Sequence, residues 1–227
     1  MTPWGRRAAA LGALALAIAG CGGGDSGAAS LKGSHVIGDG VDDHERALNA
    51  RGELPKNPID SGDIRGIRIE ADGTRLQVRF AIGAPPLDRL PAGEKRGPSW
   101  FLQLWSTDKA KGEPAYFVAI ARQGAAKAVG DAVQGWRLSV CPGTQVCTQP
   151  TPGTRLVIKG TEVRAEIPLD RLEKLRNPFS WVALSYWNDS DDPVRAWSDW
   201  VPDAARPTPG QTDYPPAGAR AVFPPKR

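Results

Sequence analysis

Histidine is nearly absent from the 227-residue chain, which contains only His35 and His44. A Ser-His-Asp catalytic arrangement would therefore depend on the first 44 residues. The chain also has no G-x-S-x-G, H-E-x-x-H or phosphate-loop motif. Glu166 with Glu70 or Asp199 would be a carboxylate pair for glycoside hydrolysis, but strand alternation explains Glu70 and Glu166 as solvent-facing residues. We therefore expect that the protein is not an enzyme.

Long runs of basic or apolar residues are also missing. The chain has 29 basic and 25 acidic residues without a Lys/Arg-rich segment, so it lacks the electrostatic footprint of a nucleic-acid-binding protein. The uncharged stretch at residues 8–20 is too short for a transmembrane helix, which needs about 20 residues. These two absences argue against a nucleic-acid partner and against a membrane span in this stretch.

The N-terminus instead carries the features of an export signal. Arg6 and Arg7 precede the apolar stretch 8–20, and small residues precede Cys21. Residues 18–21 (IAGC) resemble the lipobox of bacterial lipoproteins, in which the Cys thiol takes a diacylglyceryl group. Two or three acyl chains anchor a protein stably, whereas one does not. We expect a lipid-anchored, extracytoplasmic protein of the cell membrane or outer membrane; the alternative is an ordinary secreted protein.

The other two cysteines, Cys141 and Cys147, are separated by five residues that include the turn signal Pro142-Gly143. Export would place them where disulfides persist. Their spacing is neither that of a C-x2-C zinc knuckle nor that of a C-x-x-C redox motif. A structural disulfide is therefore favoured over a metal pair or a redox pair.

Period-two alternation of apolar residues dominates the middle of the chain. Residues 76–82 alternate in this way after the hairpin signal Asp72-Gly73, and further short runs rich in aromatic residues continue to residue 187. Pro168 and the leucines of residues 169–175 suit one short helix. Many short strands with Gly/Pro turns predict an all-β fold, an antiparallel β-sandwich.

Composition divides the chain into four segments. Residues 22–27 are mostly glycine, which is typical of a flexible spacer, and the C-terminal residues are rich in proline. We expect a signal peptide at 1–20, a lipidated tether and polar segment at 21–59, the β-sandwich domain at 60–203 and a Pro-rich tail at 204–227.

Three segments together resemble a known group of domains. They are residues 60–78 (DSGDIRGIRIEADGTRLQV), 163–169 (VRAEIPL) and 197–202 (WSDWVP). An acidic G-D-I entry, a hairpin with a Gly turn and a late strand–Pro–short helix unit resemble the carbohydrate-binding module family 9-like and DOMON-like sandwich domains. The resemblance implies a jelly-roll-like sandwich on an exported protein that binds sugar or haem.

The haem branch of that resemblance is disfavoured by the residues present. Haem-binding members usually offer Met and His as axial ligands. The only methionine is Met1, which would leave with the signal peptide, and both histidines lie in the polar N-terminal segment. We expect no haem.

The sugar branch is supported by a late aromatic and polar cluster. Indole faces stack on the apolar C–H face of sugar rings while nearby polar groups bind the hydroxyls. The predicted ligand-binding residues are Trp187, Asn188, Trp197, Asp199 and Trp200. The alternative is that Trp197 and Trp200 only cover the end of the sheet, and that Trp100, Trp105, Trp136 and Trp181 are core packing.

The same late segment carries three close carboxylates, Asp189, Asp191 and Asp192. Hard oxygen ligands suit Ca²⁺, although the spacing is not that of an EF-hand. A structural Ca²⁺ site is one hypothesis, and a solvated acidic turn is the default, with no other cofactor expected.

Taken together, these features predict a membrane-anchored lipoprotein with a ligand-binding β-sandwich for carbohydrate or an envelope polymer. The alternative is a structural or protein-docking subunit of a cell-envelope complex. A concave pair of exposed Trp side chains beside polar groups would favour a ligand, and a flat apolar patch would favour a protein partner.

Overall fold

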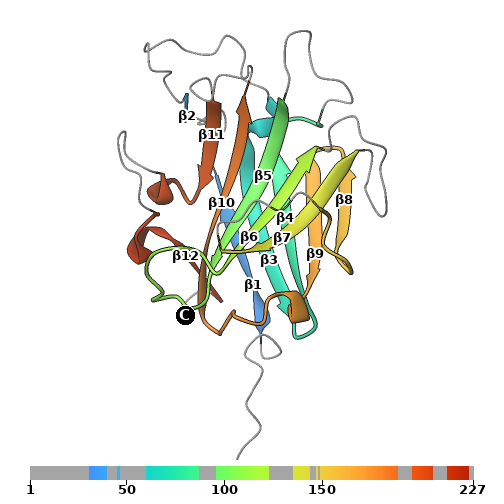
Figure 1. Cartoon of the computed structure of the whole chain (residues 1–227). Helices are drawn as coiled ribbons and strands as arrows, with labels where there is room; N and C mark the ends of the chain where they lie inside the picture. Colours follow the sequence, from blue (N-terminus) through green and yellow to red (C-terminus); the bar gives the residue numbers. More distant parts are fainter. Residues whose placement is uncertain are drawn as a thin grey trace, which may run out of the picture.

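The computed structural model describes residues 31–39, 45–46, 60–86, 96–122, 135–143, 147, 149–188, 196–206 and 214–224. Within this part of the chain the strands form two antiparallel sheets that lie face to face (Figure 1). The helices there are short 3-10 turns, which confirms the predicted all-β sandwich. None of them is long and apolar enough to cross a membrane. The predicted signal peptide, the lipidation site Cys21 and the acidic triplet Asp189, Asp191 and Asp192 lie outside the described residues.

The first sheet has the strand order β1-β3-β4-β9-β8. Its strands are β1 (Lys32–Gly38), β3 (Ile64–Asp72), β4 (Arg75–Ile82), β9 (Glu162–Pro168) and β8 (Arg155–Lys159). Gly73 turns the β3–β4 hairpin with a φ of 95°, a backbone conformation that favours glycine. The Asp72 carboxylate accepts hydrogen bonds from the backbone N–H groups of Thr74 and Arg75, and these bonds lower the pKa of Asp72 to about 2.

The second sheet has seven strands among the described residues, in the order β2-β11-β10-β5-β6-β7, with β12 also paired to β10. They are β2 (Glu45–Arg46), β11 (Ala196–Val201), β10 (Phe179–Asn188), β5 (Arg96–Trp105), β6 (Tyr116–Arg122), β7 (Trp136–Pro142) and β12 (Ala221–Phe223). Figure 1 shows β5, β6 and β10 lying in front of the first sheet. This arrangement gives the sandwich two outer faces of different composition.

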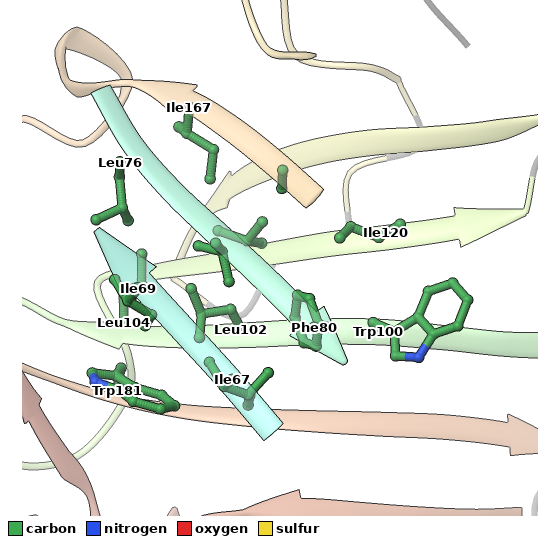
Figure 2. Packing of buried hydrophobic residues seen from close by; sticks show 14 of the residues in the cluster. Ile67, Ile69, Leu76, Phe80, Trp100, Leu102, Leu104, Ile120, Ile167 and Trp181 are labelled. Carbon is green, nitrogen blue, oxygen red and sulfur yellow. The ribbon is translucent and has the colours of Figure 1, made fainter. Parts of the chain in front are cut away.

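The hydrophobic core lies between the two sheets. Figure 2 shows Ile67, Ile69 and Phe80 of the first sheet packed against side chains of the second, among them Leu102 and Trp181. The indoles of Trp100 and Trp136 contact each other in this core, with ring centroids 4.9 Å apart. The interpretation of Trp100, Trp136 and Trp181 as core residues is therefore confirmed, and Trp105 is buried too, on the other side of the second sheet.

The sandwich extends beyond the predicted limits of 60–203. β1 pairs with β3 along its whole length, and β12 pairs with β10. By this pairing β1 and β12 provide hydrogen-bond partners for backbone groups of β3 and β10 that would otherwise lack them. The polar pattern of β1 concealed it in the sequence, since most of its residues are exposed.

The short helix expected at residues 168–175 is a 3-10 turn, η3 (Leu169–Arg171), followed by a second turn. The backbone N–H of Leu172 donates to the carbonyl of Leu169, and that of Leu175 donates to the carbonyl of Leu172. Side chains three residues apart lie on one side of such a turn, so all three leucines are buried in the core. The shared apolar face was predicted correctly, but the helix type was not.

The predicted disulfide joins Cys141, at the end of β7, to Cys147. Their Cα atoms are 5.7 Å apart, which is a usual separation for a disulfide. Gly143 turns the chain directly after β7 with a φ of 62°. The cysteine pair is thus a structural link across a tight loop.

Candidate functional site

The outer faces of the two sheets differ in the residues that their strands place there. In β3, β4 and β9 buried residues alternate with charged or polar ones, so the outer face of the first sheet is wet. In β5, β6 and β10 the residues pointing away from the core are also largely apolar. These outward residues are Phe101, Trp105, Phe117, Ala119, Val182 and Leu184. An outer sheet face of this composition is a candidate binding surface.

Four half-buried aromatic residues define this surface, which we call the aromatic face: Phe101, Phe117, Tyr186 and Trp200. The rings of Phe101 and Phe117 contact each other with centroids 5.0 Å apart. Leu184 on β10 lies directly opposite both Phe101 on β5 and Trp200 on β11, so three adjacent strands contribute to one row. Tyr186 lies two residues along β10 from Leu184 and therefore on the same face.

Polar groups lie among these aromatic rings. Gln103 lies in register between Val182 and Phe117, and it is 8% exposed. Its buried Oε1 atom accepts no hydrogen bond from any described residue. Ser198 Oγ, on the strand next to Tyr186, accepts a hydrogen bond of 3.1 Å from the indole N–H of Trp200. The aromatic face thus combines apolar ring surface with polar groups, of which Gln103 Oε1 is enclosed beneath the surface.

The C-terminal segment covers the neighbouring part of the same sheet face. Trp105, Val182 and Ala205 form a small buried cluster there, against which Tyr214 packs. The guanidinium of Arg220 lies 3.7 Å from the ring centroid of Trp105 and donates to two backbone carbonyls, those of Pro215 and Ala110. Burial lowers the pKa of Arg220 to about 10, so it stays charged at neutral pH. Trp200 of the aromatic face also packs against this cluster, so the covered part and the aromatic face adjoin each other.

The predicted ligand-binding residues are only partly brought together. Trp187 and Asn188 of β10 lie opposite Trp197 and Ala196 of β11 in the backbone register, and the side chains of the two Trp residues and Asn188 lie outside the described part of the structure. Trp200 belongs to the aromatic face.

Asp199 points to the other side of β11 from Trp200. It is fully buried, and its Oδ2 atom accepts a hydrogen bond of 2.6 Å from the backbone N–H of Ile64, at the start of β3. Asp199 and Trp200 therefore do not share one site. The position of Asp199 between the two sheets gives it a structural role.

Buried polar groups gather around that same junction. Ser185 Oγ donates to the carbonyl oxygen of Gly62, and Asp63 is fully buried beside Arg65, whose Nε lies 3.0 Å from its Oδ2. Among the described residues, no group of three or more His, Cys, Asp or Glu side chains is placed to hold a metal ion. The three aspartates predicted as Ca²⁺ ligands fall outside that search.

Sequence reasoning missed Phe101, Phe117 and Tyr186. A signal was present in residues 100–105 (WFLQLW) and 115–121 (AYFVAIA), which are apolar at consecutive positions and not only at alternate ones. A strand with this pattern places apolar side chains on both faces of its sheet. Which of them remain partly exposed depends on what neighbouring strands place beside them.

Comparison of the chain with protein-family models, with curated proteins and with solved structures gave no match.

Proposed function

We propose that the protein is a carbohydrate-binding β-sandwich and that the aromatic face is its glycan site. The supporting observation is the group of four half-buried rings on β11, β10, β5 and β6, with the hydroxyl of Ser198 beside them. Ring faces stack on the C–H face of sugars, while a neighbouring hydroxyl group hydrogen-bonds with the sugar hydroxyls. The ligand class is a neutral glycan or a comparable envelope polymer.

The proposed setting is the cell envelope. Residues 18–21 (IAGC) end an apolar stretch that follows the basic residues Arg6 and Arg7. This pattern supports lipidation at Cys21. The disulfide between Cys141 and Cys147 fits an oxidising compartment outside the cytoplasm. The protein would bind its ligand without catalysing a reaction, because the chain carries no recognised catalytic motif.

The test is calorimetric titration of the full-length protein in detergent with a panel of neutral oligosaccharides. Trp200→Ala removes one ring of the aromatic face and should weaken the binding of any ligand roughly tenfold. Lys159→Ala is the control, because Lys159 is exposed at the end of β8 on the first sheet, away from the aromatic face.

Two outcomes would argue against a glycan site. Equal affinities for Trp200→Ala and the native protein would show that the aromatic face is not where the sugar binds. No heat with any glycan, together with capture of an envelope protein that Trp200→Ala abolishes, would identify the face as a protein-docking surface.

A further inference from the structure

The outer face of the first sheet carries three arginines in a single row. Arg68 on β3 lies directly opposite Arg79 on β4, which in turn lies directly opposite Arg164 on β9. Their side chains are 49%, 34% and 28% exposed, respectively. We call this row the arginine ladder. Neighbouring strands are about 4.8 Å apart, so the ladder places like charges at regular, short intervals.

Like charges directly opposite each other destabilise a sheet, and here the pairing occurs twice in succession. A folded chain tolerates such a row when partner groups offset the repulsion. The next rung along the same strands supplies Glu70, Gln77 and Glu166, which lie opposite one another in the same register. The ladder therefore has an adjacent row of acceptors.

The acceptor row engages the arginines only in part. Arg68 donates to Glu70 at 2.6 Å, and Arg79 donates to Oε1 of Gln77 through Nε at 2.8 Å and Nη2 at 2.6 Å. Nη2 of Arg79 also lies 3.4 Å from Oε2 of Glu70. Arg164 Nε lies 3.7 Å from Glu166, which is too long for a hydrogen bond, and this buried Nε has no hydrogen-bond partner among the described residues. Three guanidinium groups thus face two carboxylates, which leaves the pair of rows positively charged.

Apolar residues bound the ladder on both sides. Val36 on β1 lies opposite Arg68 and is 61% exposed, while Val157 on β8 lies opposite Arg164 and is half-buried. The row Val36–Arg68–Arg79–Arg164–Val157 therefore crosses the whole sheet, with its charge in the middle. This linear row across the strands suits an extended ligand.

We propose that the arginine ladder binds an acidic polysaccharide that lies across β3, β4 and β9. Guanidinium groups bind carboxylates or sulfates in paired, charge-assisted hydrogen bonds, and the ladder offers three of them in line. Glu70 and Glu166 offer carboxylate oxygens as acceptors for hydroxyl hydrogens one rung away. A uronic-acid polymer carries carboxylates for the arginines and hydroxyl groups for the neighbouring acceptors, so it matches both rows of this surface.

This inference is independent of the aromatic face. The two surfaces lie on opposite sides of the sandwich, on different sheets. The first sheet would select for charge and the second for sugar rings, so failure of one site leaves the other unaffected. Each can be tested with variants that do not alter the other face.

The test is binding of the full-length protein in detergent to polygalacturonate, measured by biolayer interferometry over a range of salt concentrations. The triple variant Arg68→Gln, Arg79→Gln, Arg164→Gln should bind at least about tenfold more weakly than the native protein. It should also lose most of the salt dependence, since fewer ion pairs form. Its thermal stability should not fall markedly, because it removes two opposed like-charge pairs.

The matched control is the triple variant Arg75→Gln, Arg171→Gln, Lys111→Gln, which removes the same charge at exposed positions outside the ladder. It should retain affinity within about twofold. Equal losses in the two triple variants would show that only overall charge matters and would overturn the proposal. So would undiminished binding to methyl-esterified polygalacturonate, which lacks the carboxylate charges, or binding to vesicles of anionic lipid but not to the polysaccharide.

Discussion

The carboxylate of Asp199 on β11 accepts a hydrogen bond from the backbone N–H of Ile64 on β3, although the two residues are 135 positions apart in the chain. β11 belongs to the second sheet and β3 to the first, so this bond of 2.6 Å ties the two layers at one corner of the sandwich. Close by, Ser185 on β10 donates to the carbonyl of Gly62. Both contacts fix the entry of β3 into its sheet.

Replacing Asp199 by alanine should therefore destabilise the fold by about 2–3 kcal/mol, because a buried backbone donor loses its acceptor. The measurement is the free energy of unfolding from urea titration. Asp170→Ala is the control, since the side chain of Asp170 is 71% exposed and its ion pair with Arg171 is long, at 3.9 Å. A loss for Asp199→Ala no larger than for Asp170→Ala would refute the structural role of Asp199.

The stacking of Arg220 on Trp105 should hold the C-terminal segment against the second sheet. Arg220→Lys keeps the charge but loses the planar group that lies over the indole and donates to Pro215 and Ala110. We expect a loss of about 1–2 kcal/mol in unfolding free energy and faster proteolysis near the C-terminus. Arg171→Lys, at an exposed site, should change neither the unfolding free energy nor the rate of proteolysis. If Arg220→Lys also leaves both unchanged, the contact between Arg220 and Trp105 does not stabilise the fold.

His35 should make the stability of the fold depend on pH. Burial lowers the pKa of His35 below its ordinary value of 6.5, against a smaller opposing effect of a hydrogen bond with the backbone of Val222. The unfolded chain therefore takes up the proton first as pH falls, so stability is complete above about pH 6.5 and declines below it. The imidazole packs edge-on against Trp181, with ring centroids 5.5 Å apart, in a site that disfavours the charged form.

The measurement is the melting temperature between pH 7.5 and pH 5 for the native protein and for His35→Gln. His35→Gln should flatten the profile in this range. A native profile that rises as the pH falls from 7 to 5.5 would contradict the assigned direction of the pKa shift.

The Cys141–Cys147 disulfide should contribute modestly to stability. It closes a loop of only six residue steps, and a loop of this size restricts the unfolded chain by roughly 2 kcal/mol. The double variant Cys141→Ser, Cys147→Ser should lower the unfolding free energy by about that amount while the fold persists. Reduction of the native protein should produce a similar change; a protein that does not respond to reductant would show that the pair is not oxidised.

Much of the fold was predictable because one face of each strand in the first sheet meets water. The alternation at residues 76–82 predicted β4, whose observed bounds are Arg75–Ile82, and the Asp72-Gly73 turn before it was also correct. β1 was missed because most of its residues are exposed and only its backbone pairing with β3 makes it a strand. Pairing between distant segments leaves no local pattern in an exposed edge strand.

The site was less predictable than the fold, and for a different reason. Trp200 and Asp199 are neighbours in sequence, so the sequence suggested one cluster, but a strand directs consecutive side chains to opposite faces. The aromatic face instead assembles from four strands, and its members Phe101 and Phe117 contact each other only because β5 and β6 are paired in that register. The pairing of Trp187 with Trp197 likewise follows from the register of β10 with β11.

The central claim, that the aromatic face binds glycan, is tested most directly by hydroxyl-radical footprinting of the full-length protein with and without saturating oligosaccharide. The account predicts that the ligand protects Phe101, Phe117, Tyr186 and Trp200 from oxidation and leaves Val36, on the opposite face, as reactive as before. Unchanged oxidation of those four residues under conditions where binding is measured, or protection confined to the first sheet, would contradict it.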